Sequence, residues 1–198
     1  KTGAPGFSVV VIKNGRVLLL KGYGVEKVGS SKPMTPQTVS AMGSLTKSFT
    51  SLAILQLAEK GLVDLDTPVI TYLPWFRLAD KKKSDKITCR MLMSMRSGIP
   101  SVDKWTDYST TTDAAIEYGV RGLSNIQLSH EPGTAFEYSN EGYNILGVVI
   151  STVTKMPFRE YMAQNVLEKL DMKRSSLDLD VLKSLGVLGG HQTLIEGF

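Results

Sequence analysis

SLTKSFTSLAILQLAEK, residues 44–60, places a serine and a lysine three positions apart at the start of an apolar-periodic stretch. Residues three apart on a helix lie on the same face, so this spacing brings the Ser44 hydroxyl beside the Lys47 amine. A serine hydroxyl is a weak nucleophile, and a lysine amine made neutral by burial or by nearby positive charge can accept its proton. Ser44 is therefore a candidate covalent nucleophile. The alternative interpretation is a helix N-cap.

The same spacing recurs in Ser101 and Lys104, and the flanking residues distinguish the two cases. Ser101 follows Ser97-Gly98-Ile99-Pro100, which is typical of a loop. Ser44, in contrast, precedes a stripe with helical periodicity, made of Leu45, Phe49, Leu52, Ala53 and Leu57. The context favours Ser44 as the reactive residue.

A second group of polar residues follows the turn signal Glu131-Pro132-Gly133. Tyr138 and Asn140 lie two positions apart, so in extended or turn geometry they point the same way, and a buried helix is predicted from Tyr143 to Val153. A tyrosinate near a protonated lysine can act as general base and acid, while an Asn amide can bind a substrate carbonyl and the lysine. The structural alternatives are that Asn140 caps the helix and Tyr138 belongs to the core.

These two motifs and their flanks resemble the serine beta-lactamase and penicillin-binding protein superfamily. The similarity is to its class C branch, with D-alanyl-D-alanine carboxypeptidase, D-aminopeptidase and esterase relatives. It covers roughly residues 4 to 175. The stretches that carry it, besides the two motifs, are Ala4 to Val11, Lys13 to Val17, Lys21 to Gly24, Met34 to Thr38, Gln56 to Val69, Ile87 to Ser94, residues 97–100 and Pro132 to Gly147.

The resemblance implies an α/β (α+β) fold in which a helical lobe lies against an antiparallel sheet, with the active site between them. It implies one domain over residues 1–198, shortened between the second and third motifs and at the C-terminus, so that the sheet is incomplete. Ser44 would attack a carbonyl to give an acyl-enzyme that water hydrolyses, and Asn140 would position substrate and Lys47. Either Lys47 or Tyr138 would be the base. The substrate is open among beta-lactams, D-amino-acid peptides and small esters.

The best candidate for the family's third motif is residues 190–198, where His191 resembles the entry of the expected strand. The N–H of Leu194 would complete an oxyanion hole with that of Ser44. Thr193 occupies the place of a family glycine, and a β-branched residue there narrows the site. The alternative for His191 is an ordinary loop histidine. The alternative for the whole chain is a catalytically impaired relative that binds or traps acyl groups or serves as a scaffold.

Composition predicts a globular protein: 42% of the 198 residues are hydrophobic and 21% are charged. The net charge is +4, but the densest basic cluster, Lys81 to Lys83, has acidic neighbours and is predicted to be a solvated loop, so no nucleic-acid partner is expected. Metal-binding spacing and glycine-rich phosphate loops are missing, so no metal or cofactor is expected. Cys89 is predicted to be a buried structural thiol, and His130 a surface turn residue without a role.

The expected partners are a small-molecule or peptide substrate, with self-association through an uncovered sheet edge as a further expectation. No apolar run reaches transmembrane length. No signal peptide is present, and the resemblance implies a periplasmic or extracellular location.

Strands are predicted over Phe7 to Ile12 and Arg16 to Gly22, joined through Asn14-Gly15. Helices are predicted over Ser44 to Lys60, Thr88 to Met95, Thr112 to Gly119, Asn140 to Val153, Phe158 to Leu170 and Asp180 to Leu185.

Overall fold

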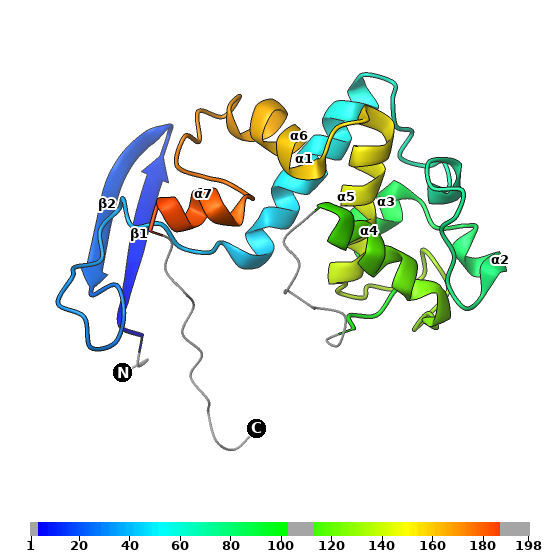
Figure 1. The fold of residues 1–198 in the computed structure, drawn as a ribbon, viewed down its shortest axis with the longest axis horizontal. Helices are drawn as coiled ribbons and strands as arrows, with labels where there is room; N and C mark the ends of the chain where they lie inside the picture. The colour runs from blue at the N-terminus through cyan, green and yellow to red at the C-terminus, as the bar shows by residue number, and fades with distance from the viewer. Residues whose placement is uncertain (1–3, 103–112, 187–198) are drawn as a thin grey trace, which may run out of the picture. The chain divides into compact units, whose positions relative to one another are not determined.

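The computed structural model of the chain describes residues 4–102 and 113–186 (Figure 1). The residues group into two compact units: one combines residues before Ser44 with residues after Asp178, and the other is Ser44–Asp178. The first contains an antiparallel β-hairpin and the second is mainly helical. The predicted combination of helices with an antiparallel sheet is confirmed. Within the described ranges, no helix has both the length and the apolar character needed to cross a membrane.

The hairpin consists of β1 (Gly6–Lys13) and β2 (Arg16–Gly24). Their connection has positive φ at both central residues, 50° at Asn14 and 72° at Gly15. Asn-Gly is the pair that two-residue turns of this kind favour, because neither residue strongly resists a left-handed backbone. The predicted hairpin and its turn are therefore confirmed.

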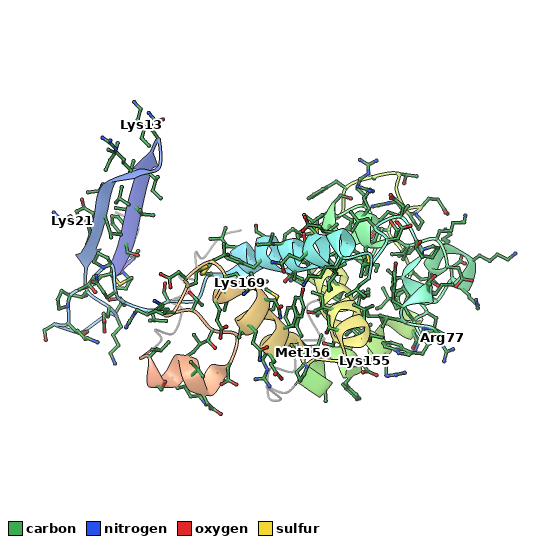
Figure 2. All side chains as sticks on the ribbon, turned by 90° about the horizontal axis from the view of Figure 1, so that it is seen from above. Lys13, Lys21, Arg77, Lys155, Met156 and Lys169 are labelled. Carbon is green, nitrogen blue, oxygen red and sulfur yellow. The ribbon has the colours of Figure 1, made fainter. Side chains whose placement is uncertain are left out.

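The hairpin exposes apolar side chains on both of its strands. The exposed large ones are Phe7, Val10, Val11, Ile12, Val17, Leu18, Leu19, Leu20 and Tyr23. Phe7 stacks on Tyr23 across the strands, with ring centroids 5.1 Å apart. Lys13 and Lys21 project from the same hairpin (Figure 2). Apolar surface of this extent is typical of a sheet that has further contacts to make.

The second unit is built around α1 (Thr46–Glu59) and α5 (Asn140–Thr154), which contact each other. Helix α5 also contacts α3, α4 and α6. The other helical elements are η1 (Gly43–Leu45), η2 (Val69–Thr71), α2 (Lys81–Ser84), α3 (Cys89–Met93), α4 (Asp113–Gly122), η3 (Leu123–Asn125), α6 (Phe158–Met162), η4 (Ala163–Leu167) and, in the first unit, α7 (Leu179–Ser184).

The buried face of α1 differs from the predicted stripe. Ala53 and Leu57 are buried as predicted, but Leu45 and Leu52 are exposed. Ile54 is buried and belongs to the same hydrophobic core as Ile145 and Ile150 of α5. Leu45 precedes the helix, which begins only at Thr46 after the 3₁₀ turn η1, so the helical spacing that placed Leu45 in the stripe does not apply to it.

Two further predictions are corrected. Lys81–Ser84 is a one-turn helix and not a loop, because the Asp80 carboxylate caps it by accepting the Lys83 N–H. The predicted helix from Phe158 to Leu170 changes after α6 into the π-helical η4. The Asn165 carbonyl in η4 accepts a hydrogen bond from the Gln56 amide of α1 at 3.0 Å. The wider turn thus contributes a contact between the two segments.

Candidate active site

Ser44 lies in the 3₁₀ turn η1 and Lys47 lies in the first turn of α1. The Lys47 Nζ donates to Ser44 Oγ at 3.2 Å, so the predicted proximity of hydroxyl and amine is present. The N-cap alternative for Ser44 is wrong: Leu45 occupies the N-cap position, and no side chain caps the helix there. The Ser44 hydroxyl is directed to Lys47 and Tyr138 instead.

Tyr138 and Asn140 reach the same lysine from the start of α5. Lys47 Nζ donates to Tyr138 Oη at 2.8 Å and to Asn140 Oδ1 at 2.6 Å. The N-cap of α5 is Ser139, whose Oγ accepts the Gly142 N–H at 3.1 Å. Because Ser139 performs the capping, the Asn140 side chain is available to bind Lys47. Tyr138 is 41% exposed, which excludes the alternative that it is a core residue.

Ser44 Oγ and Tyr138 Oη are hydrogen-bonded to each other, which closes a triangle with Lys47. The pKa of Tyr138 is lowered, chiefly by the hydrogen bond from Lys47 and next by the one with Ser44. A phenol with a lowered pKa, in contact with a serine hydroxyl, has the geometry required of a general base for that hydroxyl.

The segment that leads to Tyr138 is supported by the chain that follows α3. Met95, with a positive φ of 57°, accepts the Glu137 N–H on its carbonyl at 2.8 Å. The next residue, Arg96, exchanges hydrogen bonds with Gly133: its carbonyl accepts the Gly133 N–H, and its guanidinium donates to the Gly133 carbonyl, both at 2.7 Å. These hydrogen bonds hold the turn at Pro132-Gly133, and the residue before Tyr138, against the chain that follows α3.

Two supporting residues, Tyr143 and Glu141, were missed by the sequence analysis. Tyr143 bonds through its hydroxyl to Ser51 on α1 and to the Met93 carbonyl at the end of α3. Glu141 is buried, and its carboxylate accepts the Val102 N–H at 2.9 Å, which ties the loop after Pro100 to α5. Tyr143 could have been found, because it lies three positions after Asn140 and so shares its helix face.

The other sequence candidates have different outcomes. Ser101 lies in irregular chain, and His191, Thr193 and Leu194 fall outside the described residues. Cys89 is buried as predicted, and burial raises the pKa of its thiol to about 12. His130, predicted at a surface turn, lies in a bend and is partly buried, with its Nε2 enclosed without a partner in the described part of the chain.

Comparisons with known proteins agree with this geometry. The model of the family named Beta-lactamase matches residues 1–194. The protein flp of Staphylococcus aureus (strain MW2) is 36% identical over 180 residues, which are 91% of this chain and 36% of flp. The chain therefore spans little more than a third of the length of this relative.

Solved structures show the same relationship. An octameric penicillin-binding protein homologue from Pyrococcus abyssi superposes with a TM-score of 0.80 and 32% identity, over 98% of this chain and 45% of that one. A beta-lactamase/D-alanine carboxypeptidase from Yersinia pestis superposes with a TM-score of 0.76 and 25% identity, over 96% of this chain and 54% of that one. The chain belongs to the beta-lactamase family, within the superfamily of serine beta-lactamases and penicillin-binding proteins.

Proposed function

We propose that this chain carries the nucleophile and the base of a serine hydrolase that works through an acyl-enzyme. The observation that supports this most is the closed triangle of Ser44, Lys47 and Tyr138, with Asn140 as the third acceptor of the lysine. The Yersinia pestis neighbour, named as a carboxypeptidase, is a hydrolase of the same family. The reaction type is proposed on these two grounds together.

Tyr138 acts as the base in acylation, and the positive charge of Lys47 favours the deprotonated form of Tyr138. Lys47 donates to three oxygen acceptors, and an ammonium has three N–H donors to offer. The hydrogen bond from Lys47 is the main cause of the lowered pKa of Tyr138, which favours the tyrosinate. The tyrosinate accepts the proton of Ser44 Oγ as the oxygen attacks the substrate carbonyl, and later returns it to the leaving group.

Asn140 holds both the lysine and the substrate. Its Oδ1 is occupied by Lys47 at 2.6 Å, so its amide NH₂ remains as a donor for the carbonyl of a bound acyl group. The N–H of Ser44 is proposed as one oxyanion donor, with that of Leu194 as the second. Preorganised donors of this kind are each worth about 10²–10³ in rate in studied hydrolases.

The substrate proposed is an acyl compound with a compact, accessible carbonyl: a beta-lactam, a D-amino-acid peptide or a small ester. Tyr138 is 41% exposed and Ser44 is exposed, so the described residues leave the reacting hydroxyl open to solvent. The neighbour named as a beta-lactamase/D-alanine carboxypeptidase supports the first two classes.

Hydrolysis of one chromogenic member of each class tests the proposal. Ser44→Ala is expected to lose activity on every substrate that the chain accepts, because no nucleophile remains. Ser101→Ala is the matched control, since Ser101 shares the spacing but lies in irregular chain. Activity that persists in Ser44→Ala, or that disappears in Ser101→Ala, would contradict the assignment.

A further inference from the structure

Lys47 has a fourth neighbour besides its three hydrogen-bond acceptors. Its Nζ lies 5.7 Å from the centroid of the Tyr143 ring, while the Tyr138 ring is at 4.8 Å. A cation within about 6 Å of an aromatic ring face is attracted by the ring's quadrupole. Two aromatic rings therefore contact the ammonium whose N–H groups bind Ser44, Tyr138 and Asn140.

The Tyr143 ring is held in place through its hydroxyl. That hydroxyl has one proton, which it donates to the Met93 carbonyl at 2.9 Å. Ser51 Oγ lies 3.0 Å from the same oxygen, so Ser51 must be the donor in the second bond. Ser51 is four residues after Lys47 and lies on the same face of α1. Tyr143 thus joins α5 to α1 and to the end of α3, directly beside the lysine.

We propose that Tyr143 is a positioning residue: its ring confines the Lys47 ammonium to the point between Ser44, Tyr138 and Asn140, and its doubly bonded hydroxyl confines the ring. The consequence for catalysis rests on the proposed function, but the positioning itself does not. Tyr143 touches no reacting atom in this arrangement. Its influence passes through Lys47 to Tyr138.

Removal of the ring has a defined electrostatic consequence. In the described residues, Tyr138 and Tyr143 are the titratable groups that contact Lys47. Without the ring the ammonium is less restrained and its hydrogen bond to Tyr138 weakens. Since that bond is the main cause of the lowered pKa of Tyr138, the pKa should rise toward the ordinary tyrosine value. The rise in acylation rate with pH should move to higher pH with it.

Ring-removing and ring-retaining variants separate this role from a general structural one. Tyr143→Leu and Tyr143→Met remove the ring, and the pH at which acylation rises should increase by roughly 0.5–1.5 units. Tyr143→Phe keeps the ring but removes the two hydrogen bonds that hold it, so it should shift the profile in the same direction by less than either ring-removing variant. The matched control is Tyr72→Phe, which removes a hydroxyl that bonds to the Asp64 backbone beyond the other end of α1. A purely structural role would lower the rate at all pH values without moving the profile.

A second measurement does not depend on activity. The ionisation of Tyr138 is followed by ultraviolet absorbance as the difference between each protein and its Tyr138→Phe counterpart, in the full 198-residue chain. The expected result is a higher apparent pKa in both ring-removing variants, a smaller rise in Tyr143→Phe and no change in Tyr72→Phe. An unchanged titration in a folded ring-removing variant would overturn the inference. If the unsubstituted chain shows no acylation while the Tyr138 titration of the ring-removing variants shifts as expected, the proposed function is overturned and the positioning role of Tyr143 stands.

Discussion

At the scale of single residues, Lys47 organises the candidate site. Its three N–H donors meet oxygens of Ser44, Tyr138 and Asn140, at 3.2, 2.8 and 2.6 Å. These three acceptors come from segments about ninety residues apart, so the lysine joins the beginning of α1 to the beginning of α5. The lowered pKa of Tyr138 follows from this contact.

The pH dependence of acylation checks this arrangement. Tyr138 acts as base only when deprotonated, so the rate should rise with pH, and the lowered pKa places that rise below the ordinary tyrosine value of about 10. Tyr138→Phe should abolish the rise, because it removes the ionising phenol and keeps the ring. The measurement is single-turnover acylation across pH. A flat rate from about pH 5 to 9, with chemistry limiting, would exclude Tyr138 as the base.

At the scale of elements, the start of α5 determines where Tyr138 and Asn140 point. Ser139 is buried and caps the helix through the Gly142 N–H at 3.1 Å. Ser139→Ala should lower the free energy of unfolding by about 1 kcal/mol and reduce acylation as well, since both site residues flank the cap. Ser139→Thr keeps a capping hydroxyl and should restore most of both. Urea unfolding and acylation rates measure the two effects, and an alanine variant that loses neither would contradict the role of the cap.

Sequence patterns predicted the features that are determined by residues close together in the chain. Asn14-Gly15 specifies the hairpin turn, and the Ser44/Lys47 and Tyr138/Asn140 spacings specify which side chains share a face. The helix at Lys81–Ser84 was missed because one capping carboxylate, Asp80, outweighs a charge run that is typical of a loop. The π-helical turn η4 was missed because periodicity does not distinguish it from an α-helix.

The pairing of distant segments was beyond local patterns. The contact of Lys47 with Tyr138 and Asn140 was predicted through family resemblance, whereas Tyr143, Ser51 and the Met93 carbonyl required the packing of α1, α3 and α5. The sequence shows which helix face carries the Tyr143 hydroxyl, but its hydrogen-bond partners are known only once the positions of α1 and α3 are known. The roles of His191, Thr193 and Leu194 remain predictions.

At the scale of the molecule, Cys89 reports on the integrity of the helical unit. The thiol is fully buried at the start of α3, and burial raises its pKa to about 12. The reactive thiolate is therefore scarce at neutral pH. A thiol reagent should modify the folded chain very slowly and the urea-unfolded chain rapidly. Rapid stoichiometric modification under native conditions would show that the core around α3 opens readily.

The most direct test of the central claim is intact-protein mass spectrometry after exposure to a beta-lactam or a fluorophosphonate probe, followed by peptide mapping. The account predicts one adduct per chain, located on Ser44, absent from Ser44→Ala and unchanged in Ser101→Ala. It also predicts slower adduct formation in Tyr138→Phe, because the base is missing. An adduct located on Ser101, or one that persists in Ser44→Ala, would contradict the claim that Ser44 is the nucleophile.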